Sequence, residues 1–226
     1  QRVGCMVTGG QRWRSCRIVR HAGDRRATGK GLVTTILFVR HTEVENPDGL
    51  LYGRLPGFRL SDAGRRHAER VAGAIAGRDI AAIYSSPLLR ARQTAAIIAA
   101  RYPGATVRRS ALLTEVGSAW QGSPLRSFAS GFSTYQCPKA ADDESMEDIR
   151  ARMLAFARRA GRRHTGLAVV AVSHGDPITI LRVALKGHEL TVAAIRGSDY
   201  APLGSITEVR VEPGGEQVAL ERVWTV

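Results

Sequence analysis

Two histidines of this chain each follow an apolar run with the composition of a buried strand. His41 comes after the segment 37–40, Leu-Phe-Val-Arg, and His174 comes after the segment 169–173, Val-Val-Ala-Val-Ser. A neutral imidazole can attack phosphorus or donate hydrogen bonds to an oxyanion, and its ordinary pKa of about 6.5 makes the neutral form available at neutral pH. The pattern predicts that His41 is a nucleophile toward a phosphoryl group and that His174 stabilises the charge on its oxygens.

Two arginines stand where they could bind the same phosphate. Arg40 directly precedes His41, and Arg90 lies in the segment 83–94, Ile-Tyr-Ser-Ser-Pro-Leu-Leu-Arg-Ala-Arg-Gln-Thr. A guanidinium can hold phosphate oxygens with paired hydrogen bonds. Pro87 is suited to open a helix, which places Arg90 in a first turn, where anions are favoured.

An arginine–histidine pair alone is no evidence, because four of the six histidines follow an arginine: His21, His41, His67 and His164. For His41 taken alone, a buried structural histidine is an equal alternative. The preceding strand and the matching contexts of Arg90 and His174 favour a site.

The elements that must position these residues alternate from residue 33 onward. We expect strands at 33–39, 79–84, 106–108 and 167–172, helices at 61–76, 87–101, 145–160 and 176–185, and a hairpin of 205–211 with 218–224. Such alternation predicts an α/β fold, a three-layer α/β/α sandwich with a mostly parallel central sheet. The motifs follow strand ends, where open α/β sheets bind ligands.

The charge is unevenly distributed. The formal net charge is +13, and residues 1–30 hold eight bases and one acid. We expect residues 1–32 to form a basic, disordered N-terminal extension and residues 33–226 to form one catalytic domain. A translation start placed too far upstream, with Val33 beginning the natural protein, is a second explanation of the extension.

Composition favours a cytoplasmic enzyme without a cofactor. No apolar run approaches the roughly 20 residues of a membrane helix, and no metal or nucleotide motif is present. The three scattered cysteines argue against disulfides and structural zinc and predict a reducing compartment. Glu43, Glu45 and Asp176 are interpreted as loop and helix-start residues rather than metal ligands. The oligomeric state is not indicated.

Residues 33–211 resemble the histidine phosphatase superfamily, the group that includes the cofactor-dependent phosphoglycerate mutases. The resemblance implies a phosphoglycerate mutase-like fold, a phosphohistidine on His41 and a phosphate pocket of Arg40, Arg90 and His174, with Asn46 as a further contact. The segment 113–122, Leu-Thr-Glu-Val-Gly-Ser-Ala-Trp-Gln-Gly, nominates Glu115 as general acid and then base. Residues 115–143 would form a cap.

The chain also departs from the family pattern. Thr42 stands where glycine is usual, and Val44 replaces a Ser or Thr whose hydroxyl could bind phosphate. Thr42 is the candidate to substitute for that hydroxyl. Arg54, in Tyr52-Gly53-Arg54, is a candidate for binding a substrate anion.

Three functions follow as hypotheses. The first is a phosphatase acting on a small phosphorylated metabolite, and the second is a mutase on the same fold. The segment 115–145 has only Arg126 and Lys139 as bases, which favours hydrolysis. The third is a non-enzymatic nucleic-acid binder, disfavoured because aromatic residues are not interleaved with the basic extension. We expect no nucleic-acid or membrane partner.

Overall fold

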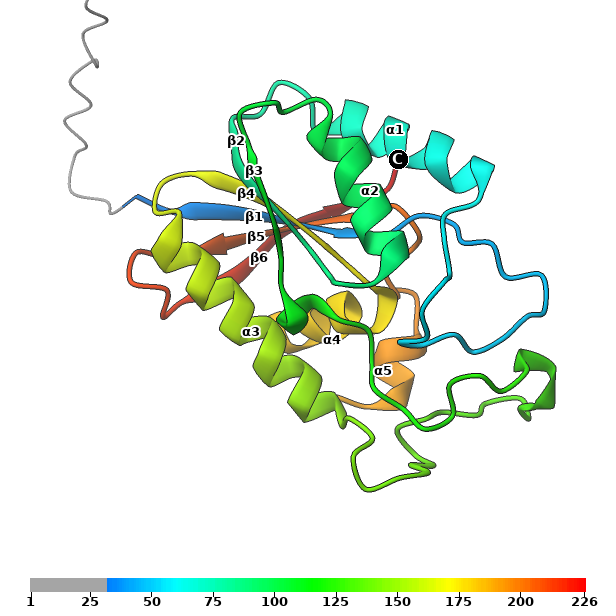
Figure 1. Cartoon of the computed structure of the whole chain (residues 1–226). Helices are drawn as coiled ribbons and strands as arrows, with labels where there is room; N and C mark the ends of the chain where they lie inside the picture. The colour runs from blue at the N-terminus through cyan, green and yellow to red at the C-terminus, as the bar shows by residue number, and fades with distance from the viewer. Residues whose placement is uncertain (1–31) are drawn as a thin grey trace, which may run out of the picture. The chain divides into compact units, whose positions relative to one another are not determined.

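Six strands form one sheet in the order β3-β2-β4-β1-β5-β6 (Figure 1). The computed structural model describes residues 32–226. The strands are β1 Thr34–Arg40, β2 Ile80–Ser85, β3 Thr106–Arg109, β4 Ala168–Ser173, β5 Ile206–Val211 and β6 Val218–Trp224. The helices are α1 Asp62–Ala74, α2 Leu89–Ala99, α3 Met146–Arg163, α4 Gly175–Leu185 and α5 Val192–Arg196, with single 3-10 turns at Ala111–Leu113 and Leu125–Ser127.

The sheet is mixed, with its parallel part at the predicted site. β1, β4, β2 and β3 pair in parallel, whereas β5 and β6 form the expected antiparallel hairpin beside β1. The most apolar strand, β4, lies between β1 and β2, as its composition predicted. The α/β class and the mostly parallel sheet are confirmed.

Helices cover both faces of the sheet, because successive side chains of a strand point to opposite sides. Ile36 and Phe38 of β1 join the core beneath α3 and α4. Leu37 and Val39 join the core beneath α1 and α2 on the other face. β1 therefore has an apolar layer on each of its faces, and it lies inside the sheet, between β4 and β5 (Figure 1).

Local signals set most helix starts. Ser61 caps α1 by accepting from the Gly64 amide, and Ser145 forms a capping box with Asp148 at α3. α2 begins at Leu89 rather than at Pro87, because Leu88 is still extended, and Arg90 keeps its place in the first turn.

The short helix α5 was not predicted. It has five residues, which is too few to show a helical period.

The segment proposed as a cap contains little regular structure. It leads from the turn at Ala111–Leu113 to α3 and includes one further 3-10 turn. Trp120, Phe128 and Phe132 pack against one another, with the two phenyl rings stacked at 4.3 Å between centroids. This aromatic cluster gives the segment a fixed shape without helices or strands.

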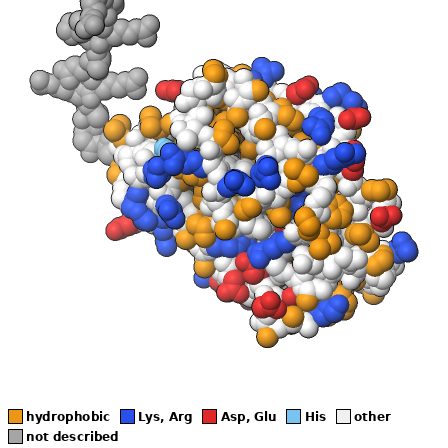
Figure 2. Space-filling model, viewed as in Figure 1, with side chains coloured by type: hydrophobic (Ala, Val, Ile, Leu, Met, Phe, Trp, Pro, Cys, Tyr) orange, Lys and Arg blue, Asp and Glu red, His pale blue; other side chains and the backbone are white. Residues whose placement is uncertain are grey.

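Arginines gather on the face that β3 and the C-terminal part of α3 share (Figure 2). Arg108, Arg109, Arg159 and Arg163 line a hollow of about 410 Å³ there, and its lining contains neither histidine nor carboxylate. The expected disordered extension lies outside the described residues, apart from Leu32. Within the described part of the chain, no helix has the length and apolarity needed to span a bilayer.

Candidate active site

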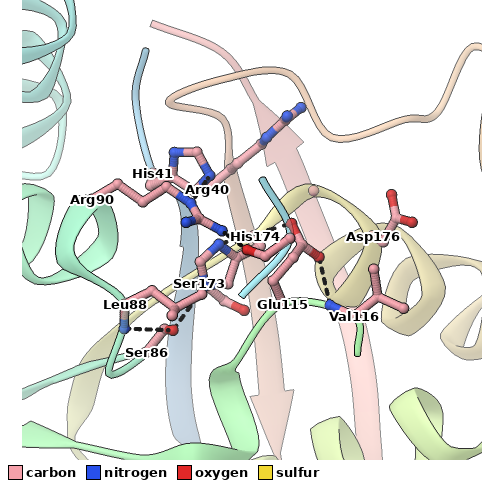
Figure 3. Close-up of polar contacts among 12 residues, drawn as sticks. Arg40, His41, Ser86, Leu88, Arg90, Glu115, Val116, Ser173, His174 and Asp176 are labelled. Atoms are coloured by element: carbon pink, nitrogen blue, oxygen red, sulfur yellow. Dashed lines mark hydrogen bonds and ion pairs between the residues drawn. The ribbon is translucent and has the colours of Figure 1, made fainter. Parts of the chain in front are cut away.

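Three neighbouring strands deliver the predicted phosphate-binding residues to one edge of the sheet. His41 follows β1, His174 follows β4, and Arg90 stands in the helix that follows β2. The rings of His41 and His174 lie 5.1 Å apart between centroids, at an angle of 64°. Figure 3 shows both imidazoles beside the guanidinium of Arg90 and close to Glu115. The structure therefore brings together residues that are up to 133 positions apart (41 to 174) in the sequence.

His41 is held in the tautomer that a nucleophile needs. Its Nδ1 lies 2.8 Å from the carbonyl oxygen of Thr42, which can only accept, so Nδ1 carries the proton. The other nitrogen, Nε2, accepts from Nε of Arg90 at 3.2 Å. Burial, reinforced by the charge of Arg90, lowers the pKa of His41 well below its ordinary value. At neutral pH, His41 therefore presents a lone pair on Nε2.

His174 is oriented by a serine that sequence reasoning did not single out. Nε2 of His174 lies 2.8 Å from Oγ of Ser86, and that oxygen also accepts from the Leu88 amide at 3.3 Å. The hydroxyl proton of Ser86 is thus free to go to Nε2, which leaves the ring proton on Nδ1. Nδ1 is buried without a hydrogen-bond partner, 3.9 Å from a carboxyl oxygen of Glu115. Burial, followed by the charge of Arg90, lowers the pKa of His174.

Both predicted arginines lie at the histidines. Arg90 is fully buried, donates to the carbonyl oxygen of Gly53 at 2.7 Å and stands over the ring of Tyr52. Arg40 stands over the ring of Tyr200, and its Nε is buried without a partner. Such unpaired buried donors are rare and costly, so their presence indicates a place prepared for an anion.

Glu115 has the surroundings of a general acid. Its carboxyl group accepts one hydrogen bond, from the amide of Val116 at 2.9 Å. Two effects raise the pKa of Glu115 to about 7. Burial is the larger effect, and the nearby charge of Asp176 is the second. A large fraction of Glu115 is therefore protonated near neutral pH.

Three other predicted residues use their polar groups elsewhere. The side-chain amide of Asn46 donates to the carbonyl oxygen of Leu50 at 2.9 Å and accepts from the N–H of Leu50 at 3.0 Å. These two bonds shape the loop that contains Asn46. The hydroxyl of Thr42 donates to the carbonyl oxygen of Gly64 at 2.7 Å. Arg54 bonds the backbone of Glu115 and pairs with Glu144 at 2.6 Å. Their contacts with phosphate or substrate stay predictions.

Asp176 is a pocket residue rather than a simple helix-start residue. It is almost fully buried and accepts bonds from Arg196 and from the hydroxyls of Tyr135 and Tyr200. Sequence reasoning placed it correctly at the start of α4 but missed this network. Its position two residues after His174 was the available signal. Its partners come from distant segments, which no local pattern reveals.

A cavity of about 350 Å³ opens beside these groups. Arg40, Glu115 and Asp176 line it, together with residues of the cap segment, while the two histidines are buried next to them. Among the described residues, the buried side-chain polar atoms without a hydrogen-bond partner are Nε of Arg40, Nδ1 of His174 and Oγ1 of Thr134. The first and last belong to lining residues of the cavity. In residues 32–226, no three His, Cys, Asp or Glu side chains cluster so that they could hold a metal ion.

Known proteins resemble this chain in sequence and in fold. The family model for the histidine phosphatase superfamily, branch 1, matches residues 36–223. An uncharacterized protein of Mycobacterium tuberculosis is 41% identical over 167 residues, which cover 70% of this chain and 81% of that protein. Phosphoserine phosphatase 1 of Hydrogenobacter thermophilus is 28% identical over 175 residues, or 74% and 82%. The solved structure of a mycobacterial glucosyl-3-phosphoglycerate phosphatase superposes with a TM-score of 0.68 at 25% identity, covering 86% of this chain and 99% of the other. The family match spans most of the chain and includes every group at the site, so the chain belongs to branch 1 of the histidine phosphatase superfamily.

Proposed function

We propose that this protein hydrolyses small phosphate monoesters through a phosphohistidine on His41. The observation that carries the proposal is the neutral Nε2 of His41 beside two guanidinium groups, with partnerless donors on Arg40 and His174 at the same place. A phosphoryl group between them would give each donor an acceptor. The same donors would stabilise the negative charge that grows on its oxygens during transfer.

In the first step, the lone pair on Nε2 of His41 attacks phosphorus. The N–P bond forms as the bond from phosphorus to the alcohol oxygen breaks, and Glu115 gives its proton to that oxygen. The hydrogen bond from Arg90 to Nε2 passes to a phosphoryl oxygen, so the nucleophile is released as the substrate binds. The proton stays on Nδ1 of His41, whose hydrogen bond to the carbonyl oxygen of Thr42 holds the ring in place.

In the second step, water attacks the phosphohistidine. The carboxylate of Glu115 takes a proton from the water, the N–P bond breaks and inorganic phosphate leaves. One carboxyl group can serve both steps because a pKa of about 7 keeps both of its forms populated near neutral pH.

The cap supports hydrolysis rather than transfer to a second phosphorylated molecule. Apart from Glu115 itself, its contributions to the cavity are uncharged: Val116, Ser118, Gln121, Leu125 and Thr134. The cap bases Arg126 and Lys139 are both exposed and do not line the cavity. A second phosphate therefore meets no cation from the cap.

The test is release of phosphate from p-nitrophenyl phosphate by the wild type, His41→Ala and His67→Ala. His67 is the matched control, because it also follows an arginine but lies on α1, where it contacts the carbonyl oxygen of Val226. We expect His41→Ala to lose at least roughly 10³-fold of turnover and His67→Ala to keep it. Equal turnover by His41→Ala and the wild type would overturn the proposal.

A further inference from the structure

We propose that the substrate is a phosphate monoester whose alcohol part is uncharged and largely apolar, and that esters carrying a carboxylate are rejected. The inference rests on the proposed function, because it takes the cavity beside Glu115 as the place of the leaving alcohol. The charge pairs and the apolar wall of that cavity support it.

The cations near the alcohol part are already paired. Apart from Arg40, which stands at the phosphate end, Arg196 is the sole cation that lines this cavity in the described part of the chain. Two nitrogens of Arg196 bond the two carboxylate oxygens of Asp176 at 2.7 and 2.9 Å. Arg54 is also paired with an acid, through a single hydrogen bond of 2.6 Å to Glu144.

Asp176 makes this pairing hard to exchange. Its side chain is only 7% exposed, and it also accepts from Tyr135 at 2.7 Å and Tyr200 at 2.9 Å. A ligand carboxylate reaching for Arg196 would have to displace Asp176 or lie beside it. Like charges that are partly removed from water repel strongly, and removing one partner of such a pair leaves a buried charge.

The rest of the cavity wall suits an uncharged group. Leu50, Leu51, Val116 and Leu125 line it, and Leu125 is 51% exposed, so an apolar ligand would cover surface that water now wets. Thr134 adds one buried hydroxyl without a partner. That hydroxyl would match a single hydroxyl or other neutral polar group on the ligand.

This substrate class differs from those that two relatives are named for. Phosphoserine and glucosyl-3-phosphoglycerate each carry a carboxylate as well as the phosphate. A free cation is the strongest hydrogen-bonding partner that a protein can offer to such a second anion. Here the cation that stands in the alcohol part of the cavity, Arg196, is cancelled by an acid of the same chain.

The experiment compares the binding of two phosphonates of equal length to the full chain by calorimetry. Propylphosphonate ends in a methyl group and 3-phosphonopropionate in a carboxylate. We expect propylphosphonate to bind at least about ten-fold more tightly. Equal binding, tighter binding of the carboxylate, or no binding of either compound would overturn the inference.

Two variants test the cause. Asp176→Asn frees Arg196 and should reduce the preference for propylphosphonate at least about five-fold, whereas Glu147→Gln, which removes an exposed acid paired with Arg150 on α3, should not change it. Leu125→Lys places an unpaired cation at an exposed position of the wall and should also favour the carboxylate, even if Asp176→Asn fails to fold. An unchanged preference in Leu125→Lys would contradict the inference.

Turnover separates this inference from the proposed function. Selective binding of propylphosphonate without hydrolysis of p-nitrophenyl phosphate would contradict the phosphatase and keep the binding class. Hydrolysis of p-nitrophenyl phosphate together with a preference for 3-phosphonopropionate would keep the phosphatase and contradict the binding class.

Discussion

Glu115 and Asp176 share one cavity but have different partners. Asp176 accepts hydrogen bonds from the guanidinium of Arg196 and from the hydroxyls of Tyr135 and Tyr200. Glu115 accepts only from the amide of Val116, and its side chain is largely removed from water, at 14% exposure, so its pKa is raised. A pair of carboxyl groups in unlike surroundings is a common source of an acid with a matched pKa.

The leaving group should decide how much Glu115 matters. In Glu115→Gln we expect the rate on an alkyl phosphate to fall roughly 10²-fold or more, because an alkoxide needs the proton. The rate on p-nitrophenyl phosphate should fall far less, because nitrophenolate leaves without it. The measurement is kcat/KM on both esters, and an equal loss on the two would show that Glu115 is not the acid.

The pH profile should report the same group. The first step needs protonated Glu115, whose pKa is raised from 4.5 to about 7, so kcat/KM for an alkyl ester should fall as the pH rises above about 7. The pKa of His41 is lowered, so the loss on the acidic side should begin well below that histidine's ordinary range. Profiles recorded between about pH 4 and pH 9 check both limbs.

A charge variant supplies the control for this profile. Asp176 raises the pKa of Glu115, so Asp176→Asn should move the alkaline limb to lower pH. Asp199→Asn, which removes an exposed acid paired with Lys186, should leave it in place. If the alkaline limb stays at the same pH in Asp176→Asn, it reports the titration of a group other than Glu115.

Among the elements, the start of α4 packs closely against the site. A Cβ on Gly175 would lie 2.4 Å from the hydroxyl oxygen of Tyr200 and 3.0 Å from the guanidinium carbon of Arg40. The helix therefore approaches the pocket so closely that only glycine fits. Glycine at a helix start commonly lets the backbone approach a ligand. At Gly175 the groups that come close are side chains of the protein itself, Tyr200 and Arg40.

Substitution at Gly175 should consequently damage activity. In Gly175→Ala, Tyr200 and Arg40 must shift, and a displacement of about 1 Å can cost roughly 10²-fold in rate. We expect Gly175→Ala to lose kcat/KM to this extent while its far-ultraviolet circular dichroism spectrum stays the same as that of the wild type. Gly73→Ala, on α1 with open space around the added methyl, is the control and should keep its activity.

At the scale of the whole molecule, the basic extension and the candidate active site occupy different parts of the sequence. Residues 1–30 carry a net charge of +7 of the total +13, and every residue placed at the site lies after residue 39. We expect a chain lacking residues 1–31 to keep phosphate release within about two-fold and to lose any non-specific, salt-dependent retention on nucleic acid that the basic extension causes. Phosphate release and gel shifts at two salt concentrations measure the two effects.

The outcome of that deletion also bears on the nucleic-acid alternative. The arginines around the hollow on β3 and α3 remain in the shortened chain. If the gel shift survives deletion and weakens with salt, nucleic-acid binding belongs to the folded part and regains weight as a function.

The sequence by itself determined most of the strands and helices along the chain and the two histidines at the centre of the site. Apolar runs and capping serines are local signals, so β1, β4, α1 and α3 could be predicted within a few residues. The short motifs after those strands nominated His41, Arg90 and His174, because parallel strands end at a common edge. α5 could not be predicted, because one turn has no period.

Only the tertiary structure decided which polar groups meet. Ser86 orients His174, Arg196 neutralises Asp176, and Arg54 is tied to Glu144, although each pair is 20 to 90 residues apart. Hydrogen bonds and charge pairs depend on distances of a few ångströms, which composition and spacing do not contain. The pKa of Glu115 and the charge of the cavity follow from those distances, because burial and neighbouring charges set both.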